Sequence, residues 1–480
     1  MRYIAFGILL FFFSSVSAQV TFYKQYSGNE YDFGNGVCQL PDSSYVVTGR
    51  SGSWGVDAEA FLLKLTKTGT YEWSQHYGSN EFDEGRRVLY NANLGYVVAG
   101  SSLQNPLNSY DFYLFNTDLS GNLLWEKRVD LGGWETTNDA VFCADSGVIA
   151  VGKSQNASGN GDKGFVVRTN VAGDTLWTKY FGATGENSVN AVLSYQDSLF
   201  IIAGTYFNQD SSMTKGFLAS IHENGTTNWF VEVGDVGAFG LTDITMNLNR
   251  INIVGWHWDP VLQKHDNYSG RYELNGTLFY ESTFVNQMEV RLDEVTLNGN
   301  QTKLYVGYRN ENTNDAAFGM DVALGRFNTN FDWDNGPIYI NHAGDEKVEQ
   351  FIPTSDGGAL AVGYITYPMN GGNSIFLMKI GPNDEATQVT GNEPMNPLVQ
   401  VNEMQNEWFN CFPNPFDDLL TVANPFTVQV EVSLVDFCGK VLSSQRLIPG
   451  MNSMDFSRLP SGIYFLQCEG TTNPIKLLKH

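Results

Sequence analysis

The chain is poor in cysteine and in positive charge. Only Cys38 and Cys143 lie in the first 400 residues, and the total of five is odd, which does not indicate a disulfide framework. The chain has 28 lysines and arginines against 52 aspartates and glutamates, so its formal net charge is −24. Such a negative surface repels nucleic acid and anionic membranes, and we expect neither as a partner.

Long apolar runs and helical periodicity are scarce as well. After residue 18, no run approaches the roughly 18 apolar residues that a membrane-spanning helix needs, so we expect no span in the mature chain. No segment keeps the apolar spacing of an amphipathic helix, which disfavours a fold of alternating strands and helices.

The first 18 residues have the pattern of a signal peptide. Arg2 supplies a charged start, residues 8–13 are apolar, and residues 15–18 are small, so cleavage is expected before Gln19. The sequence therefore predicts an exported protein.

Two ladders of residues share one period. Glycines that close short apolar runs recur at intervals of 51, 52, 52, 51, 52 and 56 residues, at Gly49, Gly100, Gly152, Gly204, Gly255, Gly307 and Gly363. An aromatic residue also follows a turn glycine by four positions in Gly69/Trp73, Gly121/Trp125, Gly173/Trp177, Gly225/Trp229 and Gly276/Tyr280. Two ladders in step indicate an internal repeat of seven units.

One unit predicts four antiparallel strands. In residues 86–131 the expected strands are 86–91, 96–101, 112–117 and 123–129, joined by turns that contain glycine. Four strands in about 50 residues are typical of one propeller blade. We therefore predict an all-β fold, a seven-bladed β-propeller, with the marker tryptophans packed between neighbouring sheets.

The two ends of the ring are predicted to meet. The seventh unit ends at its third strand, Ile375–Ile380, while Phe22–Tyr26 resembles the fourth strand Trp73–Tyr77. Pairing residues 20–27 with Ile375–Ile380 would complete the last blade and protect two open edges. Residues 19–382 are thus expected to form one domain.

The pattern changes after the propeller. Residues 383–408 are polar and contain proline, which indicates a linker. Residues 409–480 lack the repeat and contain alternating strands, Val428–Val435 and Ile463–Gln467 being the clearest, so we expect a small β-sandwich domain.

Four motifs in this last domain resemble the type A C-terminal sorting domain of the Bacteroidetes type IX secretion system. They are Cys411–Pro415, Val435–Val441, Met454–Phe465 and the basic end Lys476–Lys479. The motif residues are Pro413, Asn414, Pro415, Gly439, Gly462 and Tyr464. The resemblance implies contact with the secretion machinery, passage across the outer membrane, removal of the domain, and release or attachment at the cell surface. Separately, the cysteine count leaves open whether two of Cys411, Cys438 and Cys468 form a disulfide and which pair that would be.

The repeat units resemble the seven-bladed beta-propeller repeat of many exported bacterial proteins, with the aromatic in the fourth strand and the glycine in the second. That family implies no single activity.

Loops between the second and third strands are long and carry aromatic residues. Because flexible loops on a rigid scaffold often bind ligands, we take six of these residues as candidates. The candidates are Trp54, Tyr110, Tyr206, Trp256, Trp258 and Tyr367. Packing of each ring within its own loop is the alternative.

No catalytic or cofactor motif is present in the sequence. We expect no cofactor, although the oxygen-rich links between blades leave calcium open. The sequence predicts an exported, non-catalytic binding or interaction module whose expected ligand is an extracellular glycan or protein. The alternatives are a secreted hydrolase that cleaves polysaccharide with two carboxylates near the axis, and a structural surface protein.

Overall fold

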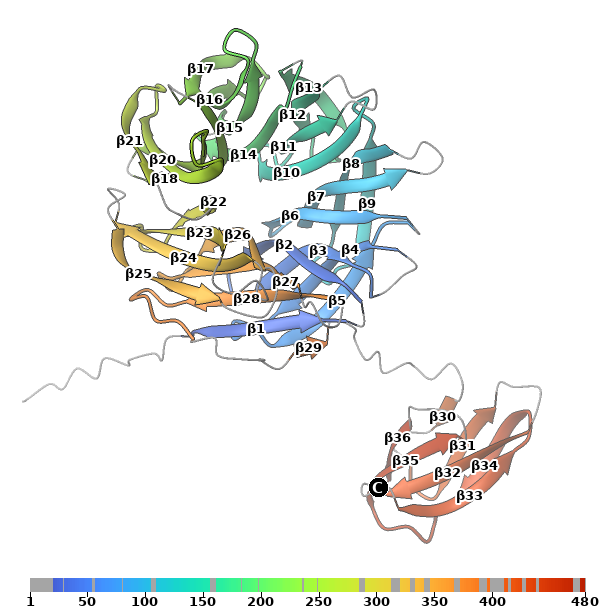
Figure 1. The fold of residues 1–480 in the computed structure, drawn as a ribbon. Coiled ribbons are helices and arrows are strands. Elements are labelled where there is room, and N and C mark those ends of the chain that lie inside the picture. The colour runs from blue at the N-terminus through green and yellow to red at the C-terminus, as the bar shows by residue number, and fades with distance from the viewer. Residues whose placement is uncertain are drawn as a thin grey trace, which may run out of the picture. The chain divides into compact units, whose positions relative to one another are not determined.

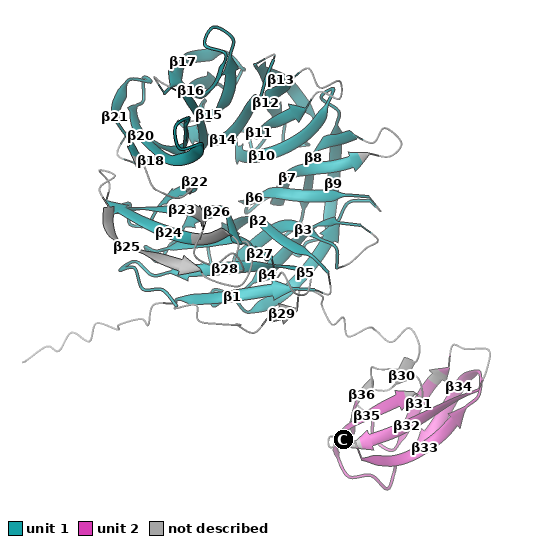
Figure 2. Ribbon diagram, viewed as in Figure 1, with its two compact units in different colours: residues 1–399 teal, residues 400–480 magenta. Residues whose placement is uncertain are grey.

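The structure is a computed structural model that describes most of the chain from Val20 to Lys479. The described residues are 20–28, 30–53, 57–79, 81–104, 109–155, 161–182, 184–196, 198–234, 237–247, 249–284, 290–311, 320–328, 333–340, 346–366, 372–387, 395–397, 410–412, 416–424, 429–436, 440–468 and 475–479. All regular elements among them are strands. The chain divides into two compact units, residues 1–399 and residues 400–480 (Figure 2).

Unit 1 is a ring of antiparallel sheets, each built from strands that follow one another in the sequence (Figure 1). Blade 1 contains β2 (Asp32–Gln39), β3 (Tyr45–Ser51), β4 (Glu59–Leu65) and β5 (Tyr71–Tyr77). Blade 2 contains β6 (Asp83–Asn91), β7 (Gly95–Gln104), β8 (Ser109–Thr117) and β9 (Leu123–Val129). Blade 3 contains β10 (Trp134–Phe142), β11 (Val148–Gln155), β12 (Asp162–Thr169) and β13 (Thr175–Phe181).

The remaining blades follow the same order. Blade 4 contains β14 (Ser188–Tyr195), β15 (Leu199–Asn208), β16 (Met213–His222) and β17 (Thr227–Val233). Blade 5 contains β18 (Ala238–Asn247), β19 (Arg250–Asp259), β20 (Lys264–Glu273) and β21 (Leu278–Phe284). Blade 6 contains β22 (Val290–Leu297), β23 (Lys303–Glu311), β24 (Met320–Asn328) and β25 (Trp333–Ile340). Blade 7 contains β26 (Glu346–Pro353), β27 (Ala359–Thr366), β28 (Asn373–Ile380), β1 (Phe22–Ser27) and β29 (Met395–Pro397).

The first strands of consecutive blades contact one another around the axis. β2 contacts β6, β6 contacts β10, and the series continues through β14, β18, β22 and β26 back to β2. An apolar cluster of described residues lies at each of the seven junctions and combines side chains of two neighbouring blades. The predicted seven-bladed propeller is therefore confirmed, because each sheet buries its faces against the next one.

The predicted closure of the ring is also confirmed. β1 pairs antiparallel with β28, and the register places Phe22 opposite Lys379 and Tyr26 opposite Ile375. The hydroxyl of Tyr26 donates to the carbonyl oxygen of Gly69 in blade 1 at 2.6 Å. β29, from the segment expected as a linker, adds to the other edge of β1 in parallel.

The glycine ladder marks a close approach of backbone to backbone. Each first strand has a β-bulge, for example between Gly34 and Gly36. A Cβ added at Gly49 would collide with the carbonyl oxygen of Phe33, just before this bulge. A Cβ at five other ladder glycines would collide with the equivalent carbonyl oxygen in the first strand of the same blade. Gly307 differs, since it faces the side chain of Val348. The bulge therefore explains most of the ladder.

The aromatic ladder joins neighbouring blades. Four of the five turn glycines pack on the tryptophan of the preceding blade, in the pairs Gly121/Trp73, Gly173/Trp125, Gly225/Trp177 and Gly276/Trp229, and Gly69 packs on Phe22 of β1. The glycines of these four pairs have φ between 80 and 85°. The indole of Trp177 also donates to the carbonyl oxygen of Glu223 at 3.0 Å. The expected packing of these rings between sheets is confirmed.

The glycine–indole contact predicts that Gly173→Ala lowers the free energy of unfolding more than Gly132→Ala does. Gly132→Ala meets no atom within 4 Å but has a φ of 92°, so it should cost about 1–2 kcal/mol of backbone strain. Gly173→Ala adds a collision with Trp125, which should cost about 1–3 kcal/mol more. Urea unfolding of both variants measures the difference. Gly173→Ala should cost no more than Gly132→Ala in a Trp125→Ala background, and an unchanged extra cost there would contradict the contact.

Unit 2 is a small sandwich of two sheets. Its strands are β30 (Asn410–Phe412), β31 (Leu419–Asn424), β32 (Val430–Asp436), β33 (Val441–Leu447), β34 (Gly450–Asp455), β35 (Gly462–Cys468) and β36 (Ile475–Lys479). The sheet orders are β30-β31-β34 and β33-β32-β35-β36. Leu420 of one sheet and Leu434 of the other share one buried cluster, as expected for a β-sandwich.

Candidate functional site

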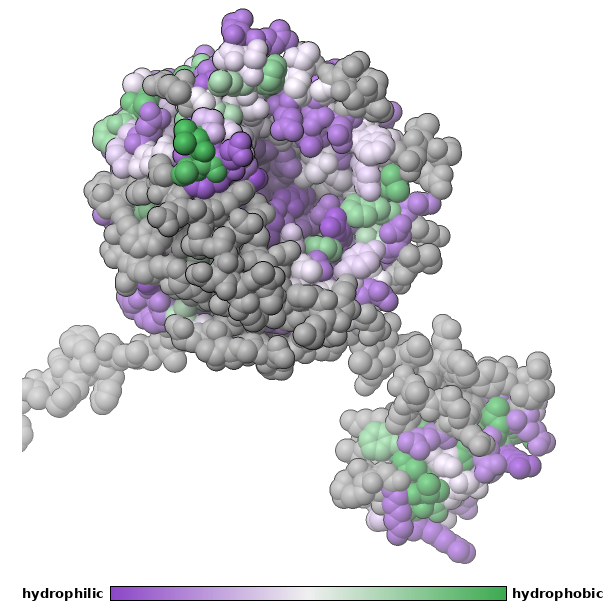
Figure 3. All heavy atoms as spheres, viewed as in Figure 1, coloured by the Kyte–Doolittle hydropathy of each residue, from purple (hydrophilic) through white to green (hydrophobic). Residues whose placement is uncertain are grey.

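A cavity of about 570 Å³ lies on the propeller axis. Its lining comes from the first strands of all blades, from the bulge to the turn that leads to the second strand. Figure 3 shows a hollow at the centre of the ring, lined on the visible face by hydrophilic residues. The cavity has the volume of a typical small-ligand site.

Side chains at four of the bulges tie their blade to the next one. The amides of Asn35, Asn138 and Asn190 donate to carbonyl oxygens of the following blade, at 2.9, 2.9 and 2.6 Å. Thr242 continues this series with a hydrogen bond of 2.7 Å to the carbonyl oxygen of Leu292. Hydrogen bonds from one blade to the next hold the backbone around the axis in place.

The residues just after the bulges accept hydrogen bonds across the same junctions. Asp139 accepts from the backbone N–H of Val192, and Asp243 from that of Val295, both at 2.8 Å. A carboxylate that accepts backbone donors is held in one orientation, so these acids are preorganised at the cavity wall.

Arg87 lies among these acids and is 7% exposed. Its Nε donates to Asp139 at 3.0 Å, and its Nη2 lies 3.7 Å from Glu294. Its Nη1 donates to the carbonyl oxygens of Asn35 and Glu349 at 3.0 and 3.2 Å. One guanidinium thereby links its own blade 2 to four other blades.

Burial and mutual repulsion change the pKa values of the axial acids. Burial, and then the charge of Asp139, raises the pKa of Asp243 to about 7. Burial, and then Asp243, raises the pKa of Glu294 well above its ordinary value. Burial alone would raise the pKa of Glu349, but ion pairs with Arg86 and Lys347 lower it to about 2.

These shifts predict that the propeller loses stability as the pH rises from 5 to 8. A carboxyl whose pKa is raised in the folded state stabilises the fold below its unfolded pKa, and this contribution disappears as the pH passes the folded value. Asp243 and Glu294 both act in this direction, whereas Glu349 acts only below about pH 4.5. The melting temperature should therefore fall across this range. Asp243→Asn should flatten the fall, and an unchanged slope would contradict the assignment.

The predicted aromatic candidates lie toward the opposite end of the blades. The loop placement of these residues is wrong, because Tyr110 lies in β8, Tyr206 in β15, and Trp256 and Trp258 in β19. All four are near the junctions of the second and third strands, away from the turns that border the cavity. Tyr110 packs on Phe82, and Tyr206 donates to Glu232. The structure does not bring these residues together with the axial cavity. Trp54 and Tyr367 lie outside the described residues.

The two tryptophans of blade 5 share one neighbour. The rings of Trp256 and Trp258 lie 5.0 and 4.8 Å from the ring of His265, measured between centroids. His265 in turn lies 2.8 Å from Arg291. Packing within the strands thus involves both candidate rings.

Acids at the links between blades cap the backbone. Asp32, Asp83 and Glu135 accept hydrogen bonds from the N–H groups of Gly28, Ser79 and Leu131, each four residues earlier. Asp32 and Glu135 also accept from serine hydroxyls of the second strand. These oxygens already have protein donors.

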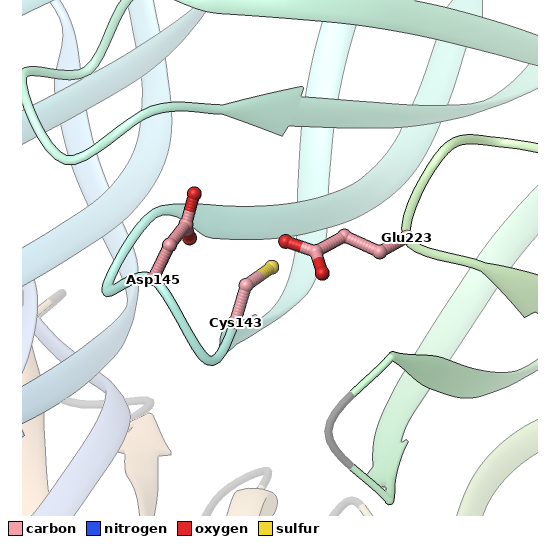
Figure 4. Close-up of side chains that lie close together, drawn as sticks. All are labelled: Cys143, Asp145 and Glu223. Carbon is pink, nitrogen blue, oxygen red and sulfur yellow. The ribbon is translucent and has the colours of Figure 1, made fainter.

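Two groups of side chains could offer metal ligands. Cys143, Asp145 and Glu223 place one ligand atom each within 4.8 Å of one another (Figure 4), and so do Asp111, Asp130 and Glu135. Arg168, 2% exposed, donates to Asp145 at 2.7 Å and pairs with Glu223. Burial raises the pKa of Cys143 to about 12. The first group is therefore an ion-pair cluster that joins blades 3 and 4.

A family model decides the identity of unit 2. The secretion system C-terminal sorting domain family matches residues 410–478. These residues are a type IX sorting domain. The resemblance seen in the motifs is thus confirmed, and the sorting domain indicates export, to the cell surface or beyond it, through contact with the secretion machinery.

Two motif residues of the sorting domain have described side chains or contacts. Tyr464 is buried, and its hydroxyl donates to the carbonyl oxygen of Pro460 at 2.7 Å, close to Gly462. Pro413, Asn414, Pro415 and Gly439 lie outside the described residues, as does Cys438. Nothing described bears on the disulfide pairing. Cys38 and Cys143 are free thiols.

The chain is similar to the structure of the Neurospora crassa Pan2 WD40 domain, with 11% identity, a TM-score of 0.43, and coverage of 74% of this chain and 97% of that chain. The number of blades comes from the strand pairing and not from this likeness. No curated protein matches the chain. Among the described residues, no helix is long and apolar enough to span a membrane.

Proposed function

We propose that this exported propeller is a non-catalytic binding module whose ligand enters the axial cavity. The observation that supports the proposal is the cavity itself, with acids held by backbone donors around one buried arginine. Rigid polar groups in a concave site bind a ligand without first having to be ordered.

The route to the outside is proposed to begin at the signal peptide, residues 1–18, with cleavage before Gln19. The sorting domain would be removed at the outer membrane, and the propeller would be released or attached to the cell surface. Amino-terminal and carboxy-terminal sequencing of the protein from the medium and from the cell surface tests both cleavages.

The binding role is tested with the mature chain from Gln19 to His480. Arrays of glycans and peptides are scored for retention and for turnover, with wild type, Glu294→Gln and Glu186→Gln. Glu186 is exposed and lies at a blade link, so its variant is the control. Retention that depends on Glu294 and leaves the ligand intact is the expected result. No retention of any array member would contradict the proposal.

A hydrolase with axial carboxylates is the second candidate. Asp243 and Glu294 both line the cavity, and the raised pKa values suit a general acid. Release of product by wild type and its loss in Asp243→Asn would favour this function over binding alone.

We further propose that the propeller needs no metal. Asp32 and Glu135 at the blade links already accept backbone and serine donors, and Arg168 supplies positive charge in the Cys143 cluster. The melting temperature in EDTA should equal that in calcium. A rise of several degrees with calcium would show that a site had been missed.

A further inference from the structure

The axial cavity is lined by more acidic than basic side chains. Its charged lining residues are Arg87, Asp139, Asp243 and Glu294. Asp139 lies 3.0 Å from the guanidinium of Arg87 and neutralises it. Two carboxyl groups remain in a place where burial makes an uncompensated charge costly.

Glu294 is the acid with the fewest partners. Its side chain is only 12% exposed, and among the described residues it accepts no hydrogen bond and has one ion pair, with Arg87 at 3.7 Å. Asp243 differs, because it accepts the N–H groups of Ile244 and Val295. A nearly buried carboxyl that accepts no hydrogen bond within the protein can accept one from a ligand.

Aromatic rings form part of the same wall. Tyr90, Phe142 and Phe351 line the cavity together with aliphatic side chains such as Val88 and Ile352. The faces of aromatic rings attract cations, and the apolar surface accommodates methylene groups. The wall therefore suits a slender organic chain that ends in a positive charge.

We propose that the axial cavity binds a primary ammonium group carried on an alkyl chain, with Glu294 as the main acceptor. This inference rests on the proposed binding function and names the ligand class for the same site. An ammonium group is compact and has three donors, enough for Glu294, Asp243 and one further acceptor. Such a chain can belong to a free diamine or to a lysine side chain of a protein.

The cavity volume favours this ligand over a bare metal ion. A volume of about 570 Å³ holds a chain of several atoms, whereas a metal ion needs a close shell of oxygens. Asp139 and Asp243 are already held by backbone donors in separate blades. An anionic ligand is disfavoured, because three carboxyl groups face one guanidinium.

Binding should release protons. In the empty cavity, protons on Asp243 and Glu294 relieve the repulsion among Asp139, Asp243 and Glu294, while Arg86 and Arg87 oppose protonation. The positive charge of a bound ammonium group would relieve the same repulsion, so the protons on Asp243 and Glu294 would be released. Affinity should therefore rise between pH 6 and pH 8.

The test uses titration calorimetry on the mature chain with four probes. The probes are 1,5-diaminopentane, 1,5-pentanediol, acetyl-Gly-Lys-Gly-amide and the same peptide with norleucine in place of lysine. At least one amine probe should bind, its neutral analogue should bind about 10-fold more weakly or not at all, and proton release should appear as a dependence of heat on buffer. Comparison of the diamine with the peptide distinguishes the two sources.

Variants show whether binding occurs in the cavity. Glu294→Gln should weaken the amine probe about 10-fold or more, with an unchanged near-UV spectrum, whereas Glu186→Gln should bind as wild type does. Failure of both amine probes to bind, or equal affinity in Glu294→Gln, overturns the ammonium inference. Retention of an uncharged glycan that depends on Glu294 would overturn the ligand class and keep the binding function. If no probe and no array member binds, both the binding function and the ammonium ligand class are overturned.

Discussion

Deletion of residues 20–30 should abolish the cooperative thermal unfolding of the propeller. The deletion removes β1, exposes the edge of β28, and takes Phe22, Tyr23 and Tyr26 out of two apolar clusters. A ring that lacks one outer strand also loses the contact of Tyr26 with Gly69 in blade 1. Scanning calorimetry of the mature chain and of the deletion variant measures the effect.

Point variants show whether the ring closure causes the loss. Tyr26→Ala removes a fully buried ring and should cost about 3–5 kcal/mol, while Tyr26→Phe removes only the hydrogen bond and should cost about 1 kcal/mol. Lys24→Ala, in the same strand but partly exposed, should change stability by less than about 0.5 kcal/mol. Equal effects of Tyr26→Ala and Lys24→Ala would contradict this closure.

Arg87→Met should cost about 3–5 kcal/mol, because it leaves buried carboxylates without their partner. The side chain is 7% exposed and joins Asp139, Glu294 and two carbonyl oxygens. The cost should be larger at pH 8 than at pH 5, since Asp243 and Glu294 are protonated in acid. Urea unfolding at both pH values gives the two free energies.

An exposed ion pair supplies the control. Lys127 lies 2.9 Å from Asp174, and their side chains are 39% and 58% exposed. Lys127→Met should cost less than about 1 kcal/mol at either pH. A similar cost for Arg87→Met would mean that the axial network contributes little to stability.

The fold could be predicted from the sequence because its two ladders have direct physical causes. A glycine is needed where the carbonyl before a bulge presses on the second strand, as at Gly49. A second glycine is needed where a turn meets the indole of the neighbouring blade, as at Gly173. These constraints recur in most blades, so they left a period in the sequence. The predicted strands of blade 2 were too short at the end near Gln104 and Ser109, since polar residues there extend the sheet.

The axial site could not be predicted in the same way. Arg87, Asp139, Asp243 and Glu294 occupy equivalent positions after the bulges, but Gly36 and Ala191 occupy the same position in other blades. Each residue type therefore looks isolated in the sequence, and only the closed ring brings the four together. The sequence signal that could have revealed the site is the spacing of these four residues, which lie one or two repeat lengths of about 52 residues apart.

The aromatic candidates were chosen for their loops and not for their neighbours. The sequence predicted long loops at Tyr206 and Trp258, but the structure extends β15 and β19 through these residues. Their partners, Glu232 on β17 and His265 on β20, come from other strands of the same blade. Burial of one ring face by such partners cannot be read from spacing alone. The role of these residues in binding stays a prediction.

The strand that completes the ring comes first in the sequence and pairs with nearly the last residues of the propeller. Phe22 pairs with Lys379, so β1 has no pairing strand until the chain has been synthesised as far as β28. In a chain whose synthesis stopped before β28, the edges of β1 and β27 would stay unpaired. The aromatic residues of β1 would then be accessible to proteases. The ring can therefore close only after synthesis has passed β28, which ends at Ile380.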